Sequence, residues 1–134
     1  MEACVKLERL WLYRCGRMSD AAVCRLAASC TSLCQVSLHK CEKVGDDAVI
    51  ALATHCQRTL VNLGLMGCFL VSDKGLQTLA ACPALEDLDA RELPLLTDRS
   101  IDAIISRCTK LQRLCIQGSD GLSDRFSDLD ICWG

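Results

Sequence analysis

The sequence predicts an α/β solenoid, in which strands and helices alternate along a stack of similar units. Three series of residues support this prediction, because each recurs about every 26 residues along the chain. A fixed period of roughly 20–50 residues is typical of solenoid folds. The three series are Cys4, Cys30, Cys56, Cys82 and Cys108; then Cys15, Cys41, Cys68, Leu93 and Ser119; then Asp20, Asp46, Asp73, Asp98 and Asp124.

Each unit changes its hydrophobic period partway along. In the first unit, Leu10 and Leu12 alternate with other residues, as in a short strand with one buried face. Val23 and Leu26 then follow Asp20 at intervals typical of a helix with one buried stripe. We therefore predict one strand and one helix per unit. The strands should form a curved parallel sheet on the inside of a right-handed solenoid, with the wider helices outside.

Hydroxyl side chains precede most of the predicted helices. A hydroxyl at this position can accept a hydrogen bond from a backbone N–H of the first helical turn, and a following aspartate favours the positive helix end. We expect each of these residues to cap the helix that it precedes. They are Ser19, Ser72, Thr97 and Ser123.

The units define the expected organisation of the chain. Residues 1–124 form one repeat domain, with units starting near residues 4, 30, 56, 82 and 108. Residues 125–134 form a divergent C-terminal tail, because Ser127 and Asp130 stand where the helical pattern needs aliphatic residues. Neither end of the stack carries a clear polar cap, although terminal repeats need one. Two explanations stay open: the chain is a fragment or short isoform, or its ends are covered by a partner or by a second copy.

Composition excludes several classes of function. The net charge of −2 disfavours a protein that binds nucleic acid by neutralising phosphates. The longest nearly apolar stretch, residues 64–71, is too short to span a membrane, and the N-terminus does not resemble a secretory signal. We therefore expect a cytoplasmic or nuclear protein whose 12 cysteines are thiols rather than disulfides.

The cysteines are predicted to act as small buried hydrophobic residues. A zinc site would need close ligand pairs with a matching pair downstream. A catalytic thiol would need an exposed cysteine facing a base, and neighbours in the chain rarely face each other. We expect no catalytic residues, no metal and no cofactor. The closest candidate ligand pairs have no matching pair downstream; they are Cys30 with Cys34, His39 with Cys41, and His55 with Cys56.

The strand positions between the buried leucines should point away from the core and line the concave face. Trp11 and Tyr13 occupy such positions in the first unit, and the chain has only two tryptophans and one tyrosine. Trp, Tyr and Arg dominate binding hot spots. An alternative is that both rings merely cover the end of the stack. The predicted binding residues are Trp11, Tyr13, Arg14, His39, Met66, Asp87, Asp89 and Arg91.

The repeated motif resembles a known class. It reads Leu-x2-Leu-x-Leu-x2-Cys, followed by an aliphatic residue, Ser or Thr, and Asp. This motif is similar to the cysteine-containing leucine-rich repeat of F-box leucine-rich-repeat proteins and of proteins like the antagonist of mitotic exit network. The resemblance covers about residues 4–124. Leu93 and Ser119 depart from it at the cysteine position, and Ala90 replaces a strand leucine.

The resemblance implies a non-enzymatic protein–protein interaction module. Its expected role is substrate recognition for an F-box-type ubiquitin ligase, with the protein substrate on the concave face and cullin-type ligase subunits as further candidate partners. The first unit starts at Cys4, so we expect the chain to lack an F-box and to bind substrate without delivering it. The alternative is a repeat-only scaffold or inhibitor with no link to ubiquitin, or a truncated isoform.

Overall fold

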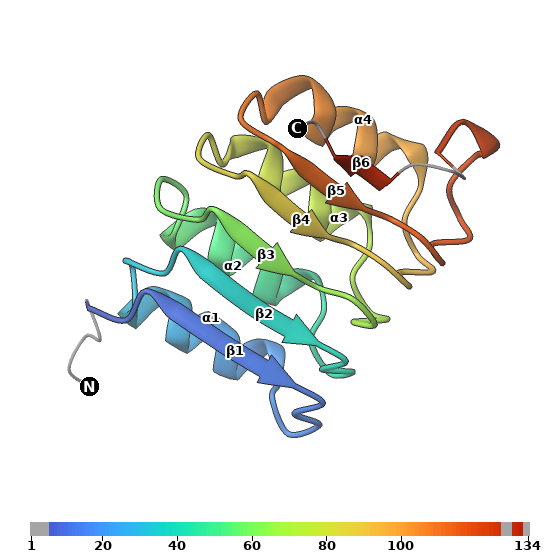
Figure 1. The fold of residues 1–134 in the computed structure, drawn as a ribbon. Coiled ribbons are helices and arrows are strands. Elements are labelled where there is room, and N and C mark those ends of the chain that lie inside the picture. Colours follow the sequence, from blue (N-terminus) through green and yellow to red (C-terminus); the bar gives the residue numbers. More distant parts are fainter. Residues whose placement is uncertain (1–5, 127–129, 133–134) are drawn as a thin grey trace.

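The computed structural model describes residues 6–126 and 130–132, and it has the mixed α/β arrangement of a repeat solenoid (Figure 1). Strands form one face of the stack, and helices cover the other (Figure 1). Within the described residues, five strands pair in parallel in the order of the sequence. They are β1 (Arg9–Tyr13), β2 (Gln35–His39), β3 (Asn62–Gly64), β4 (Asp87–Asp89) and β5 (Arg113–Cys115).

The helices follow the strands in turn, as the change of period predicts. They are α1 (Asp20–Ser29), α2 (Asp46–His55), α3 (Asp73–Leu76) and α4 (Asp98–Arg107). In the third unit the helical stretch is split, because α3 continues as the 3-10 helix η1 (Gln77–Ala81). A further 3-10 helix, η2, spans Asp124–Phe126.

The core lies between the sheet and the helices. Equivalent leucines stand in register on neighbouring strands, so that Leu63 pairs with Leu88 and Leu88 with Leu114. All three are at most 2% exposed. The first unit is less covered, because Leu10 and Leu12 of β1 are only partly buried. Burial of the aliphatic row therefore begins fully at the second unit.

The cysteines after the strands bond to backbone rather than only filling space. The Cys68 thiol donates to the carbonyl of Leu38 in the preceding unit at 2.9 Å. Ser119 takes the same role in the fifth unit, because its hydroxyl donates to the Ala90 carbonyl at 2.8 Å. Leu93 is fully buried at the equivalent position. Cys4 lies outside the described residues, and the cysteines whose side chains are described are free thiols.

The aspartates lie in the first turn of their helices, as expected, and they also make bonds between units that were not expected. Four of the five carboxylates, those of Asp20, Asp46, Asp73 and Asp98, accept hydrogen bonds from the start of the next helical stretch along the stack. Asp46 accepts from the amides of Ser72 and Gly75 at 2.8 and 3.0 Å. Gly75 leaves room for this contact, because a Cβ there would lie 2.5 Å from the Asp46 carboxylate. In the other cross-unit bonds, the amides of Gly45 and Ala48 donate to Asp20, that of Thr97 donates to Asp73, and that of Ser123 donates to Asp98.

The predicted hydroxyl caps are present at two helices and wrong at a third. The Ser19 hydroxyl accepts from the Ala22 amide at 3.4 Å, and the Ser72 hydroxyl accepts from the Lys74 amide at 3.3 Å. Thr97 makes no side-chain cap to its own helix. Its hydroxyl donates to the Asp73 carboxylate instead, because that stronger charged acceptor is already in place from the unit before.

At the C-terminal end of the stack, part of the divergent tail folds back onto the last unit, a point that the sequence left open. Strand β6 (Asp130–Cys132) pairs antiparallel with β5 and extends the sheet at this edge (Figure 1). Phe126 in η2 is 6% exposed. An added strand satisfies backbone groups that an edge strand leaves unpaired. The remaining tail residues, 127–129 and 133–134, lie outside the described residues.

No helix in the described part of the chain is long and apolar enough to cross a membrane.

Candidate functional site

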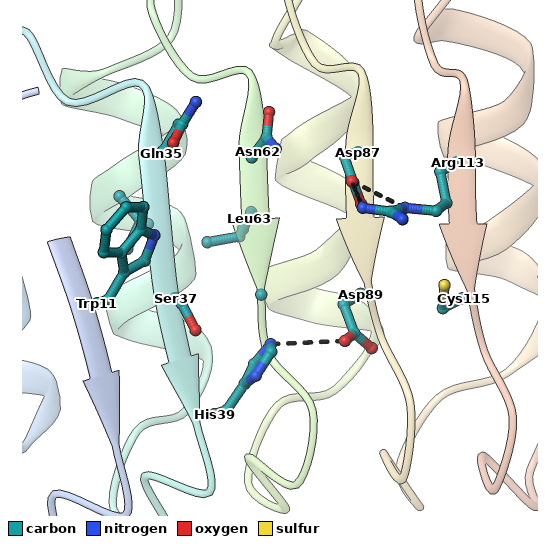
Figure 2. A pocket seen from close by; sticks show the side chains of 12 residues that line it. Trp11, Gln35, Ser37, His39, Asn62, Leu63, Asp87, Asp89, Arg113 and Cys115 are labelled. Carbon is teal, nitrogen blue, oxygen red and sulfur yellow. Dashed lines mark hydrogen bonds and ion pairs between the residues drawn. The ribbon is translucent and has the colours of Figure 1, made fainter. Parts of the chain in front are cut away.

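A hollow of about 180 Å³ lies on the strand face of the sheet. Figure 2 shows side chains from all five parallel strands converging on it. The hollow combines one large aromatic ring with amide, hydroxyl and charged groups, so it offers both apolar contact and hydrogen bonding. Its lining residues are Trp11, Gln35, Val36, Ser37, His39, Asn62, Leu63, Gly64, Asp87, Asp89, Arg113 and Cys115.

The structure brings together half of the predicted binding residues at this hollow, namely Trp11, His39, Asp87 and Asp89. The other four, Tyr13, Arg14, Met66 and Arg91, do not line it. Arg91 still contacts the site through Asp89. Arg14 borders a separate depression beside Lys40 and Phe69.

The contact between His39 and Asp89 crosses the middle of the hollow. The two side chains come from β2 and β4, and their Nε2 and Oδ2 atoms are 3.5 Å apart (Figure 2). They meet because Gly64 on β3, between them, has no side chain. A Cβ at Gly64 would lie 2.3 Å from Nε2 of His39. The gap in the third unit therefore lets the second and fourth units touch.

Asp89 is held as a carboxylate. Burial raises its pKa, but hydrogen bonds from Arg91 and the nearby positive charge outweigh this, so the pKa lies below the usual value. Arg91 donates from Nε and Nη2 to the two carboxylate oxygens at 2.9 and 2.7 Å. Such a bidentate pair fixes the orientation of the carboxylate plane relative to the guanidinium plane. Asp89 is thus a fixed negative charge on the floor of the site, 3.5 Å from Nε2 of His39.

Asp87 is paired in a similar way across the strands. It stands in register with Arg113 of β5, whose Nε donates to Oδ2 of Asp87 at 2.9 Å (Figure 2). Arg113 is a lining residue that the predicted set omitted. The signal for it was present, because opposite charges occupy equivalent strand positions in consecutive units.

A second contact across the third unit lies just beyond the strands. Lys40 forms an ion pair with Glu92, and Gly67 stands between them. Lys40 and Glu92 have positive φ values of 59° and 56°, as does Arg14 at 53°. A Cβ at Gly67 would lie 2.6 Å from the Lys40 side chain. Gly64 and Gly67 therefore serve the same purpose, since each leaves space for a contact across the third unit.

The aromatic end of the face is open. Trp11 is 67% exposed and Tyr13 is 60% exposed. The Arg14 guanidinium lies 5.3 Å from the centre of the Tyr13 ring. Most of both rings is therefore available for contact, next to a hollow whose charged groups largely neutralise one another. Within residues 6–126 and 130–132, no group of three His, Cys, Asp or Glu residues could hold a metal ion.

Comparison with known proteins identifies the fold and leaves the family open. No family model and no curated protein matches the chain. Among solved structures, it is similar to a chain of the crystal structure of the Rad7 and Elc1 complex in yeast. The TM-score is 0.84 with 22% sequence identity, over 93% of this chain and 31% of that chain. This chain therefore spans about a third of its structural neighbour, with which it shares the repeat-solenoid fold.

Proposed function

We propose that the chain is a non-enzymatic protein-interaction module, and that its strand face binds a segment of a protein partner. The observation that carries the proposal is the open Trp11 ring beside the hollow of about 180 Å³. Exposed tryptophan and tyrosine next to paired arginines are the residue types that supply most binding energy at protein interfaces. Asp89, held by Arg91, gives the face a fixed polar group that orients a partner.

The finer proposal is that these are about five cysteine-containing leucine-rich repeats that act in substrate recognition for a ubiquitin ligase. Two observations support it. The repeat motif resembles that of F-box leucine-rich-repeat proteins, and one similar solved structure is that of the Rad7 and Elc1 complex. We propose a cytoplasmic or nuclear site of action, with cullin-type ligase subunits as candidate partners.

The non-enzymatic part of the proposal is supported by the state of the thiols. Burial raises the pKa of Cys68 to about 12 and that of Cys82 to about 11. At neutral pH these thiols carry a proton and are poor nucleophiles. A structural role fits these values, and the Cys68 thiol donates to the Leu38 carbonyl.

A substitution pair tests the face. The tagged chain would be purified from cells with the proteasome blocked, in parallel with its W11A/Y13A variant, and partners identified by mass spectrometry. We expect the recovered amount of each specific partner to fall about 30-fold or more in the variant, because each aromatic hot spot contributes about 2 kcal/mol or more to binding. A matched control is R107A/K110A, which alters two exposed residues away from the strand face. Partners unchanged by W11A/Y13A in a folded variant would contradict the proposal.

The same experiment separates the two functional classes. Recovery of a cullin and its adaptor supports the ubiquitin ligase role. Recovery of specific partners without any ligase subunit favours a scaffold or inhibitor, which would use the same face to cover another protein's site.

A further inference from the structure

Within the described residues, no strand pairs with the outer edge of β1. Among the described residues β1 pairs only with β2, and it lies at the end of the sheet opposite β6 (Figure 1). The Glu8 carbonyl accepts from Gln35 at 3.1 Å, and the Arg14 amide donates to His39 at 2.9 Å. Because backbone groups alternate sides along a strand, even-numbered residues of β1 face β2. The backbone groups of the odd-numbered ones, Arg9, Trp11 and Tyr13, therefore point outward.

Strand β1 lacks the usual protection of an edge. It has five residues, whereas β3, β4 and β5 have three each. It contains no proline and one charged residue, Arg9. Short length, proline and several charges are the devices that keep an edge from pairing. At the opposite end of the sheet, the edge of β5 is paired with β6, whereas the described residues place no such added strand on β1.

Apolar side chains are left uncovered beside this edge. Leu10 and Leu12 are only partly buried, whereas their counterparts on β2, Val36 and Leu38, are 3% and 0% exposed. Cys15, Met18 and Leu26 of the same unit are likewise partly buried. A strand placed along β1 would therefore bury apolar side chains of its own against this row.

The net charge of the first unit favours one kind of partner. Residues 6–29 carry five cations and two anions, a net charge of +3 in a chain whose total is −2. One of the two anions, Asp20, already accepts hydrogen bonds from the second unit. Within the part of the chain that the structure describes, Arg9, Arg14, Arg17 and Arg25 form no ion pair. An acidic partner is favoured, and a second copy of this basic end is repelled.

We infer that the edge of β1 is a docking site for an extended acidic segment of a partner protein, which adds to the sheet as a further strand. Its inward side chains are apolar and cover Leu10 and Leu12, and its acidic side chains lie on the strand face beside Arg9, in the positive field of the first unit. Backbone hydrogen bonds supply affinity and alternate side chains supply specificity in this mode of recognition. The inference goes beyond the proposed function, because it places a partner on the edge rather than on the strand face.

Arg9→Pro tests the backbone contact. The outward position 9 carries no hydrogen bond to β2, so proline keeps the β1–β2 ladder and removes one donor from the free edge. The probe is a fluorescent synthetic peptide of about eight residues in which glutamate alternates with valine. We expect R9P to weaken binding by about tenfold or more. The matched control R9Q removes the charge and keeps the donor, so it should weaken binding by about threefold. Thermal denaturation of each variant confirms that it is folded.

Charge and geometry are tested separately. A peptide with lysine in place of glutamate should bind about tenfold or more weakly, because the edge is basic. Amide hydrogen exchange measured by NMR should slow at Trp11 and Tyr13 when the acidic peptide binds. The amides of Leu10 and Leu12, which face β2, should change little.

Several results would overturn the inference. These are equal binding of the two peptides, no binding of the acidic peptide, unchanged exchange at Trp11 and Tyr13, or full binding by R9P. Self-association that R9P abolishes would assign the edge to a second copy instead. The W11A/Y13A variant keeps the backbone edge, so loss of partners there, with acidic peptide binding intact, separates the strand face from the edge.

Discussion

At the scale of single residues, an absent side chain organises the candidate site. Gly64 separates His39 from Asp89, and the two residues meet only because β3 offers no Cβ at that point. Gly64 is also buried, so a larger side chain at this position could not avoid His39 by pointing into solvent. The floor of the hollow thus depends on three consecutive strands, of which the middle one contributes empty space.

We predict that Gly64→Ala displaces His39 and costs about 1 kcal/mol of unfolding free energy, since the crowded atom is the end of a side chain that can rotate away. Urea denaturation measures the loss. The double variant G64A/H39A should lose less than the sum of the single losses, because the clash is gone once the imidazole is removed.

Gly16→Ala is the matched control for this prediction. A Cβ at Gly16 would meet nothing within 4 Å. Its unfolding free energy should stay within about 0.5 kcal/mol of the wild type, as for a substitution away from buried features. Additive losses in the G64A/H39A cycle would show that the two positions are not coupled.

At the scale of elements, the helices depend on carboxylates from the unit before. Asp73 accepts from the amide of Thr97, at the start of α4, at 2.9 Å and from its hydroxyl. Burial raises the pKa of Asp73, but the hydrogen bonds from Thr97 and the charge of Arg99 outweigh this and lower it overall. The folded state therefore prefers the ionised form more strongly than the unfolded chain does.

This shift predicts acid sensitivity. A carboxyl group whose pKa is lower in the folded state adds stability above its unfolded pKa of about 4, and the stability is lost as pH falls through the folded value. We expect the unfolding free energy to fall below about pH 4. The fall should be shallower in Asp73→Asn, which cannot titrate. Chemical denaturation at a series of pH values measures both slopes.

Asp47→Asn is the control. Asp47 is exposed in the first turn of α2, and its side chain makes no hydrogen bond to another described residue. Its slope should match that of the wild type. An identical pH profile for D73N would mean that the cross-unit carboxylate does not contribute to acid sensitivity.

At the scale of the whole molecule, the two ends of the sheet differ. Strand β6 covers β5 by antiparallel pairing, with Leu114 opposite Ile131. We predict that deleting residues 127–134 lowers the unfolding free energy by about 1–3 kcal/mol, because several backbone hydrogen bonds are lost. The bared edge should also promote concentration-dependent association. Denaturation and analytical ultracentrifugation measure the two effects.

Deleting only residues 133–134 is the control for this truncation. It leaves β6, which ends at Cys132, in the chain. Its stability and oligomeric state should match those of the full chain. A monomeric, fully stable product of the longer deletion would mean that β6 does not protect the edge.

The repeat period was sufficient to predict the order of strands and helices and the buried aliphatic rows. It could not predict bonds between units, because the reach of Asp46 to Ser72 depends on how far one unit is displaced against the next. Strand β6 carries no repeat signal, since it pairs in the opposite direction from the strands before it. Its recruitment follows from the unpaired edge of β5 rather than from a pattern in residues 130–132.

The candidate site could likewise be predicted only in part. Alternation along the strands placed Trp11, His39, Asp87 and Asp89 on the correct face. Tyr13 shares that alternation but does not line the hollow, whose lining includes Gly64, the position of β3 that has no side chain. Register between strands, rather than alternation within one, decides which residues meet.

The direction of the aspartate series bears on how the chain is made. Each carboxylate accepts from amides that come later in the sequence, from Asp20 onward to Asp98. During synthesis the accepting aspartate is made first. The start of the next helical stretch therefore emerges when its hydrogen-bond acceptor is already present in the chain. Repeat arrays fold by propagation between neighbours, and domains generally fold in the order of synthesis. The solenoid is therefore built for growth from its N-terminal unit outward, with each turn serving as the template for the one that follows.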